Sequence, residues 1–243
     1  MLKVGIITQA RMTSTRLPGK ILLKANEKTV LEHHINRLAW SNIPIFVATT
    51  VNDSDMPVVN VCESLGFDYF RGDEHNVLER FYKCADENKL DVIIRVTSDC
   101  PLIDGKVIKE GLTQYLKLNN PNVYYSNCLA RTYPRGLDFE IFSFDQLKDA
   151  YLNATLESDK EHVTPYINQN KSGRVLTVDH ISVTNFNHLR WTLDTPDDWV
   201  LIRTIIEQYK GETLSYSQLL EIIENSPDLA TLNIHIKQKE IEL

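Results

Sequence analysis

VGIITQARMTSTRLPGK, residues 4–20, joins an apolar run to a polar loop, and this combination indicates the class of fold. The apolar run predicts a strand over residues 3–7. The loop behind it carries three cations and three hydroxyls, namely Arg11, Arg16, Lys20, Thr13, Ser14 and Thr15. Arginine offers forked donors and lysine a point charge, and both match phosphate oxygens. Because open α/β sheets bind ligands beyond the carboxyl ends of their strands, we expect this loop to hold a polyphosphate.

The loop matches neither of two common phosphate-binding motifs. It is not a P-loop, because Lys20 is followed by Ile21 and the position five before Gly19 is Ser14 rather than glycine. It is not a dinucleotide fingerprint, because no GxGxxG follows the strand. The alternative is a solvated basic turn, with Pro18 and Gly19 as turn residues. Two arginines, a lysine and three hydroxyls are more than such a turn requires.

Composition places the chain among ordinary globular proteins. It has 243 residues, 42% of them hydrophobic and 24% charged, which suits one large α/β domain or one domain with an insertion. The net charge of −7 argues against a general nucleic-acid binder, which needs a basic face. Cations concentrated in one loop of an acidic protein favour a small anionic ligand.

Three further observations bear on the compartment. The four cysteines are widely spaced without a CxxC pair, which favours buried reduced thiols over a zinc site or a disulfide framework. No apolar run approaches the roughly 18 residues that a membrane span needs. The first strand begins almost at Met1, so we expect no signal peptide. We therefore expect a cytoplasmic protein without a membrane partner.

Strand and helix patterns alternate in the first half of the chain, which predicts parallel βαβ units with right-handed crossovers. Strands are expected at residues 3–7, 44–49, 68–70, 91–96, 123–126, 139–142, 174–178 and 189–193. Helices are expected at residues 29–40, 55–65, 76–88, 105–118, 146–154, 161–169, 196–209 and 216–225, with Asp53 or Ser54 capping the second. We expect one domain over residues 1–243. Residues of about 123–182 would form a smaller subregion that packs on the core or on a second subunit.

Two aspartates follow predicted strands and are candidate metal ligands. Asp99 lies in VTSDCPL, residues 96–102, directly after the strand at 91–96. Magnesium prefers oxygen ligands and takes one or two carboxylates plus substrate phosphates. The alternative for Asp99 is a turn cap before Pro101. Asp194 lies in WTLDTPDD, residues 191–198, where Asp194 or Thr195 suits a helix N-cap and the two aspartates at 197 and 198 suit the helix dipole.

Together, these parts describe one reaction class. The loop cations would hold a nucleotide triphosphate, and Asp99 and Asp194 would hold its magnesium ion. Attack of a substrate hydroxyl on a phosphate needs mainly positioning and charge neutralisation.

Six motifs carry a resemblance to a known family. Ala10-Arg11, Ser14, Arg16-Leu17-Pro18 and Lys20 resemble the A-R-x-x-S-x-R-L-P-x-K loop of the CMP-sugar synthetases, which include the 3-deoxy-manno-octulosonate and acylneuraminate cytidylyltransferases. The spore-coat polysaccharide F-type branch is similar to this chain in RGDEHNVLERF (71–81), VTSDCPLID (96–104), PRGLDFE (134–140), EHVTPYI (161–167) and RWTLDTPDD (190–198). The resemblance covers residues 1–210, roughly.

The resemblance implies a fold and an activity. The fold is a three-layer α/β/α nucleotide-diphospho-sugar transferase fold, with a mostly parallel sheet and a small insertion. The activity is transfer of CMP from CTP to the hydroxyl of an acidic or modified sugar, with release of pyrophosphate, for surface polysaccharide synthesis. Mg²⁺ is the implied cofactor, CTP and a small sugar are the implied substrates, and the implied assembly is a homodimer.

The resemblance also implies roles for individual residues. The nucleotide would contact Ala10, Arg11, Ser14, Arg16, Lys20 and Ser98, with the Ala10 backbone at the cytosine. Arg11, Lys20 and Asp99 would carry catalysis, and Asp99 and Asp194 would hold the magnesium. There is one departure, because the octulosonate enzymes have Q-G-D-E-P where this chain has TSDCP at 97–101. Asp99, the aspartate expected to bind the metal, is kept, but Ser98 replaces a glycine. The preferred nucleotide base and the identity of the acceptor sugar are therefore left open.

The acceptor residues implied are Arg71, Asp73, Arg135, Asp138, Glu140, Glu161 and His162. For each, a surface ion pair or a helix cap is an alternative, and Glu161 is expected in a first helical turn, where it favours the dipole. His162 is expected to open the same helix and to reach a carboxylated sugar. The other six histidines show no ligand spacing.

Two other functions stay open at this point. A metal-dependent glycosyltransferase would use a ready-made nucleotide sugar and often carries D-x-D, a spacing present in Asp53-Ser54-Asp55. That triplet follows the second strand and also suits a helix cap. A non-catalytic nucleotide-binding homologue would keep the fold without the chemistry.

Overall fold

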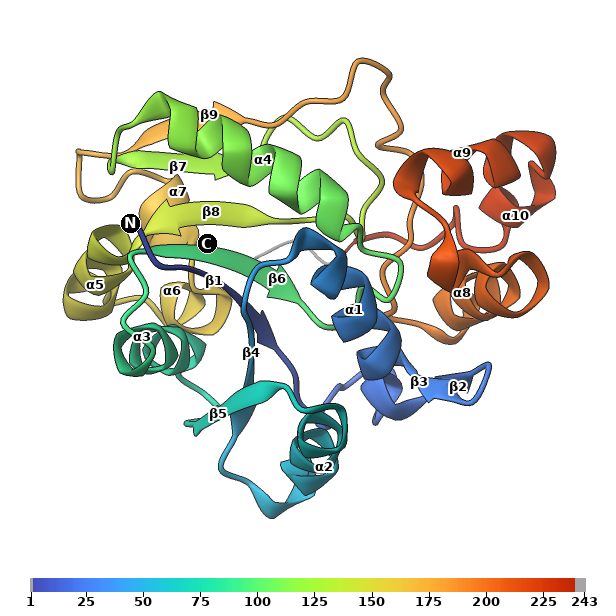
Figure 1. Cartoon of the computed structure of the whole chain (residues 1–243), viewed down its shortest axis with the longest axis horizontal. Coiled ribbons are helices and arrows are strands. Elements are labelled where there is room, and N and C mark those ends of the chain that lie inside the picture. Colours follow the sequence, from blue (N-terminus) through green and yellow to red (C-terminus); the bar gives the residue numbers. More distant parts are fainter. Residues whose placement is uncertain (1, 239–243) are drawn as a thin grey trace.

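The computed structural model describes residues 2–238, and its centre is a seven-stranded sheet in the order β5-β4-β1-β6-β8-β7-β9 (Figure 1). The strands are β1 (Val4–Gln9), β4 (Ile45–Thr50), β5 (Asp68–Gly72), β6 (Val92–Thr97), β7 (Val123–Ser126), β8 (Glu140–Ser143) and β9 (Leu176–Asp179). Strands β5, β4, β1 and β6 are parallel neighbours, whereas β8 runs antiparallel to both β6 and β7. Strands β7 and β9 are parallel, so the sheet is mostly parallel, as predicted.

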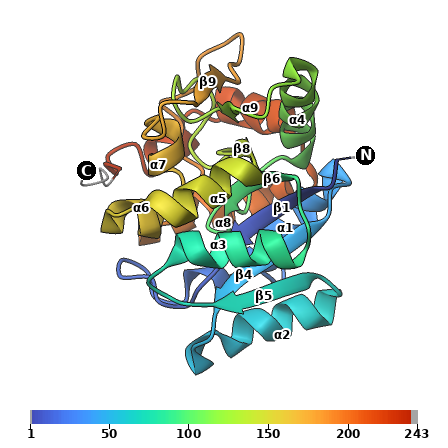
Figure 2. The ribbon, with the colours of Figure 1, turned by 90° about the vertical axis from the view of Figure 1, so that its left-hand side faces the viewer.

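Helices cover both faces of the sheet, so the three layers expected from the sequence are present. The helices are α1 (Val30–Leu38), α2 (Met56–Leu65), α3 (Val77–Glu87), α4 (Gly105–Leu118), α5 (Phe144–Asn153), α6 (Glu157–His162), α7 (Pro165–Asn168), α8 (Pro196–Tyr209), α9 (Tyr216–Asn225) and α10 (Asp228–Thr231). Figure 2 shows α3, α5 and α6 over one face. The short strands β2 (Lys24–Ala25) and β3 (Lys28–Thr29) form a separate antiparallel pair.

The two sides of β1 bury their side chains in two different cores. Ile6 belongs to the core that includes residues of α1, α2, α4, α8 and α9, whereas Ile7 belongs to the core that includes residues of α3 and α5. Both isoleucines are fully buried. A strand covered on both faces has an almost continuous apolar sequence, and this is why the run at residues 4–7 marks a central parallel strand.

Local signals set the helix boundaries that the sequence predicted best. Thr195 is the N-cap of α8 and forms a capping box with Asp198, and Pro196 occupies the first turn. Ser215 begins α9 with a second capping box. Helices α4, α8 and α9 and strand β7 have the expected bounds.

Three local expectations are wrong. The helix expected at 161–169 is two short helices, because Val163 has φ of +70° and Pro165, which has no backbone N–H, occupies the first turn of the second helix. The strand expected at 189–193 makes a single isolated bridge, from Arg190 to Arg135. The N-cap of α2 is Asp55, whose side chain caps no helical N–H because it is bonded elsewhere.

The segment of about 123–182 contributes β7, β8 and β9, which continue the main sheet beyond β6. Its packing against a second subunit stays a prediction. Within residues 2–238, no helix has both the length and the apolar character needed to cross a membrane. The parallel order of β1 and β6 brings the loops after these two strands to the same edge of the sheet.

Candidate active site

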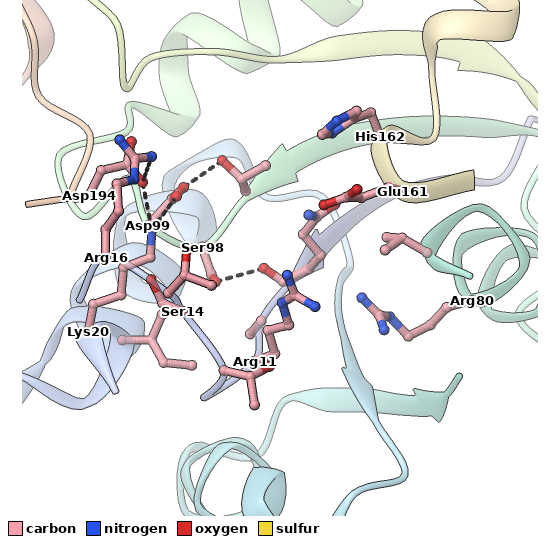
Figure 3. Close-up of a pocket in the computed structure, with 17 residues that line it drawn as sticks. Arg11, Ser14, Arg16, Lys20, Arg80, Ser98, Asp99, Glu161, His162 and Asp194 are labelled. Carbon is pink, nitrogen blue, oxygen red and sulfur yellow. Dashed lines mark hydrogen bonds and ion pairs between the residues drawn. The ribbon is translucent and has the colours of Figure 1, made fainter. Parts of the chain in front are cut away.

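A cavity of about 290 Å³ opens at the carboxyl ends of β1 and β6 (Figure 3). All residues expected to contact the nucleotide or the metal line it, namely Ala10, Arg11, Ser14, Arg16, Lys20, Ser98, Asp99 and Asp194. They come from three separate parts of the chain. The structure therefore brings together the three stretches singled out in the sequence.

Two acidic residues fix the first loop to the neighbouring strands. Asp55 is fully buried; its carboxylate accepts the Met12 N–H at 2.7 Å and also the Thr50 hydroxyl. Glu74 accepts the Thr13 hydroxyl at 2.6 Å and the Asn52 amide at 2.5 Å. These contacts fix the loop beside the carboxyl ends of β4 and β5. They also give Asp55 a structural role, so the D-x-D spacing at 53–55 is not a metal motif.

Lys20 lies at the centre of the polar wall of the cavity. Its Nζ donates to Asp99 Oδ2 at 2.8 Å, to Asp194 Oδ1 at 2.9 Å and to the Leu193 carbonyl at 2.7 Å. Burial acts to lower the pKa of Lys20, but the two carboxylates outweigh burial and the pKa is raised. Burial likewise acts to raise the pKa of Asp99, and Lys20 overcomes it, which leaves that pKa at about 2. Both groups are therefore charged near neutral pH.

Asp194 is held by two further cations. Arg16 Nη2 lies 3.0 Å from Oδ1, and Arg190 Nη2 donates to Oδ2 at 2.8 Å. Arg190 also donates through Nε to Asp198 at 2.9 Å, and Asp198 is fully buried. Asp198 accepts the backbone N–H groups of Asp194 and Thr195, both at 3.0 Å. Beyond the helix-dipole role that the sequence suggested, Asp198 thus fixes the turn before α8 that presents Asp194.

The donor set suits a hard divalent cation. Two carboxylates and one backbone carbonyl converge within 3 Å of a single atom, Lys20 Nζ. No cluster of three His, Cys, Asp or Glu side chains suited to a metal occurs in the described part of the chain. Magnesium characteristically takes one or two carboxylates and completes its shell with water and substrate phosphates. Asp99 and Asp194 therefore fit a magnesium ion that arrives with a nucleotide.

Arg80 lines the same cavity and was not predicted from the sequence. Its side chain is only 2% exposed; Nη1 donates to the Asp73 carbonyl at 2.7 Å, and Nε has no partner among residues 2–238. Burial, and then the charge of Arg11, lower the pKa of Arg80 to about 10. Figure 3 shows Arg80 extending from α3 toward Arg11. The sequence signal was an arginine on the buried face of α3, three residues after Val77 and one before Phe81.

A second cavity of about 350 Å³ adjoins the first, and both are lined by Thr97 and His162. Three arginines and two carboxylates line the second cavity, namely Arg95, Arg131, Arg135, Asp138 and Glu140. The structure thus brings together four of the residues expected at the acceptor, counting His162. Glu161 lies on the first cavity instead. Glu161 and His162 are the last two residues of α6, so the expectation that they begin a helix is wrong.

The charges of the second cavity are paired except for one. Arg131 forms a forked pair with Asp138, with Nη2 to Oδ2 at 3.0 Å. Glu140 accepts from Arg95 and Tyr124, and from Thr164 Oγ1 at 2.6 Å. Within residues 2–238, no carboxylate forms an ion pair with Arg135. Burial, then Arg131, lower the pKa of Arg135, as expected for a cation without a counter-ion.

Two of the expected acceptor residues lie outside both cavities. Arg71 donates to the backbone carbonyls of Thr50 and Asn52 at 2.9 and 3.0 Å, and so joins β5 to the end of β4. Asp73 accepts the N–H groups of His75 and Asn76, both at 2.7 Å. Arg71 and Asp73 therefore have structural roles, which are neither the ion pair nor the helix cap considered as alternatives.

Comparison with known proteins agrees with this geometry. The sequence profile of the family described as cytidylyltransferase matches residues 5–241. An uncharacterised protein of Methanocaldococcus jannaschii is 34% identical, over 97% of this chain and 96% of that protein. The spore coat polysaccharide biosynthesis protein SpsF of Bacillus subtilis is 31% identical, over 93% and 95%.

Solved structures give the same result. A cytidylyltransferase of Leptospira borgpetersenii serovar Hardjo-bovis superposes with a TM-score of 0.91 at 30% identity, covering 99% of this chain and all of that one. CMP:2-keto-3-deoxy-manno-octonic acid synthetase, solved with CTP, has a TM-score of 0.62 at 17% identity, which shows a shared fold over 85% of this chain and 99% of that one. The cavity at the carboxyl ends of β1 and β6 thus belongs to a nucleotidyltransferase, and the chain is a member of the cytidylyltransferase family.

Proposed function

We propose that the protein transfers CMP from CTP to a hydroxyl group of an acidic or modified sugar and releases pyrophosphate, in the synthesis of a surface polysaccharide. One observation carries the proposal: the basic loop and the two carboxylates meet around Lys20 Nζ at the edge of the sheet. The Bacillus subtilis relative SpsF is a spore coat polysaccharide biosynthesis protein, which supports the assignment to polysaccharide synthesis.

The first cavity suits the nucleotide. Arg11, Arg16 and Lys20 supply positive charge along one wall, and Ser14 and Ser98 supply hydroxyls. Arg11 lies 3.5 Å from Glu74 with 40% of its side chain exposed, so a phosphate can replace this weak contact. A magnesium ion held by Asp99 and Asp194 would neutralise charge on the phosphates when bound.

In the reaction, the acceptor oxygen forms a bond to the α-phosphorus of CTP while the bond from that phosphorus to the bridging oxygen breaks. The acceptor hydroxyl gives up its proton to solvent water, and pyrophosphate leaves with the electron pair of the broken bond. The chain contributes by holding the two substrates in line and by balancing the charge that collects on the phosphate oxygens.

The second cavity suits the acceptor sugar. Arg135 offers a cation with no carboxylate partner in the described residues, which suits a carboxylate or another anionic group on the sugar. Asp138 and Glu140 present carboxylate oxygens that accept hydrogen bonds from sugar hydroxyls. His162 lines both cavities and so lies where the two substrates meet.

Pyrophosphate release from CTP, measured with a panel of neutral and acidic sugars and with ATP, GTP and UTP as controls, tests the proposal. We expect release with CTP, Mg²⁺ and at least one sugar acid. Asp99→Asn should lower turnover by at least about a hundredfold while the melting temperature stays within a few degrees. A folded protein that binds CTP but is silent with every sugar would instead indicate the non-catalytic homologue.

Thermal shift separates this proposal from a glycosyltransferase, since CTP with magnesium should stabilise a cytidylyltransferase and a nucleotide sugar should stabilise the other class. The homodimer and the cytoplasmic location remain predictions. Light scattering of the purified chain tests the homodimer.

A further inference from the structure

The Lys20 ammonium lies between the two carboxylates that are suited to a metal. Nζ is 2.8 Å from Asp99 Oδ2, 2.9 Å from Asp194 Oδ1 and 2.7 Å from the Leu193 carbonyl, and the side chain is only 12% exposed. A magnesium ion held by the same two carboxylates needs oxygens at about 2.0–2.1 Å. Such an ion would take the space that the ammonium fills, so the ammonium and the metal are alternative occupants.

The charges around this position are already balanced. Three cations contact three carboxylates in one connected cluster, namely Lys20, Arg16 and Arg190 with Asp99, Asp194 and Asp198. A divalent cation added alone would leave the cluster strongly positive in a partly buried place, where charges interact more strongly than in water. A triphosphate changes this balance, because its oxygens offer the ammonium a new anionic partner.

Without the ammonium, the two carboxylates would repel each other. Asp99 and Asp194 belong to loops 95 residues apart in the chain, and each is within 3 Å of the same nitrogen. Asp194 retains Arg16 and Arg190 as partners, and Asp99 retains the Thr97 hydroxyl at 2.7 Å. Among the described residues, Lys20 is the one side chain that bonds to both carboxylates.

We propose that Lys20 is a positioning residue that holds Asp99 and Asp194 together in the nucleotide-free protein and keeps divalent cations out until a triphosphate draws its ammonium away. The metal then enters together with the nucleotide rather than before it. The identity of the displacing ligand rests on the proposed function. The exclusion of metal from the nucleotide-free protein rests on the contacts of Lys20 alone.

Mn²⁺ binding to the nucleotide-free protein, followed by electron paramagnetic resonance of the free ion, tests this proposal. Lys20→Met should bind one Mn²⁺ per chain at least about tenfold more tightly than the wild type, because the competing charge is gone. Lys24→Met is the matched control, since Lys24 is exposed, lies four residues away and removes the same charge. Its Mn²⁺ affinity should equal that of the wild type.

A double variant tests whether the gain in Mn²⁺ affinity depends on the Asp99 carboxylate. Asp99→Asn combined with Lys20→Met should return Mn²⁺ affinity to the wild-type level. Mn²⁺ should also raise the melting temperature of Lys20→Met, but not that of the wild type. If Lys20→Met is unfolded without metal, Lys20→Gln takes its place with the same expected gain, and refolding of either variant by Mn²⁺ supports the proposal.

Three results would overturn the proposal: equal Mn²⁺ affinity in the wild type and in a folded Lys20 variant, a gain that survives in the double variant, or a Lys20 variant that gains no more than Lys24→Met. Turnover of the wild type with CTP and sugars is measured separately. Silent turnover together with a gain in Lys20→Met refutes the proposed function and leaves the metal exclusion standing. Turnover by the wild type without a gain in the Mn²⁺ affinity of Lys20→Met would refute the metal exclusion and leave the proposed function standing.

Discussion

Replacing Arg190 by methionine tests whether the buried ion pairs behind the site hold it together. The Arg190 side chain is 7% exposed and donates to Asp194 at 2.8 Å and to Asp198 at 2.9 Å. Removing one partner of a buried pair costs roughly 3–5 kcal/mol, because the other charge is left buried without compensation. Asp198 would keep Asn233 as a donor at 2.8 Å as well as two backbone N–H groups, which places the expected cost near the lower end.

The loss should be visible in thermal unfolding. For a chain of this size, about 1 kcal/mol shifts the melting temperature by about 2–4 °C, so Arg190→Met should melt about 6–12 °C below the wild type. Arg203→Met is the matched control, because Arg203 makes an exposed pair with Glu207 on α8 and its side chain is 57% exposed. That pair is worth at most about 0.5 kcal/mol. Equal melting temperatures for the two variants would refute the reasoning.

The pH dependence gives a second check. Burial acts to raise the pKa of Asp198, but the bonds from Arg190 and Asn233 outweigh it, and this pKa lies below its ordinary value. A carboxylate with a lowered native pKa stabilises the fold above its unfolded pKa of about 3.9, and this contribution is lost as the pH falls through the native pKa. The difference in unfolding free energy between the wild type and Arg190→Met should therefore be steady from about pH 6 to 8 and narrow only below about pH 4. A gap that widens on acidification contradicts the assignment.

Three further substitutions test other parts of the site. Arg80→Met should weaken CTP binding about ten- to a hundredfold in titration calorimetry, because a buried cation facing the cavity is lost, whereas the exposed Lys83→Met on the same helix should not. Arg135→Gln should raise the KM for an acidic sugar at least about tenfold in steady-state kinetics and leave the KM for CTP within about twofold. Gly136→Ala should cost about 3 kcal/mol or more in urea unfolding, since φ is +107° and a Cβ would lie 2.6 Å from the Trp191 backbone. Gly173→Ala, with φ of +74° and open space around it, should cost only about 1–2 kcal/mol.

The elements that the sequence predicted best are those defined by short-range signals. Strand β1 is an apolar run covered on both faces, and α8 begins with a threonine cap and a proline within two residues. Such signals depend on neighbours along the chain. The first loop was likewise identified from residues within a single stretch, and the cavity around it contains all of the expected nucleotide residues.

What the sequence missed depends on contacts between distant residues. Glu74 bonds to Thr13 across 61 positions, and Lys20 bonds to Asp194 across 174. Val163, a β-branched residue with φ of +70°, divides the expected helix at 161–169, and a single sequence gives no sign that this backbone conformation is tolerated. Arg71 has the same charge as Arg135, and the two differ in role because one pairs with backbone carbonyls while the other lines a cavity.

The position of Thr97 and His162 restricts where transfer can occur. Both line each cavity, and Thr97 is the last residue of β6, two positions before Asp99. Because Thr97 Oγ1 donates to Asp99 Oδ1 at 2.7 Å, the boundary between the cavities is tied to the carboxylate proposed to hold the metal. In the proposed reaction, the α-phosphate would lie at this boundary, because Thr97 and His162 are the residues that line both cavities. In the proposed reaction, an acceptor would place its hydroxyl beside His162 and its anionic group at Arg135, and these two constraints together would select among sugars more strongly than either residue alone.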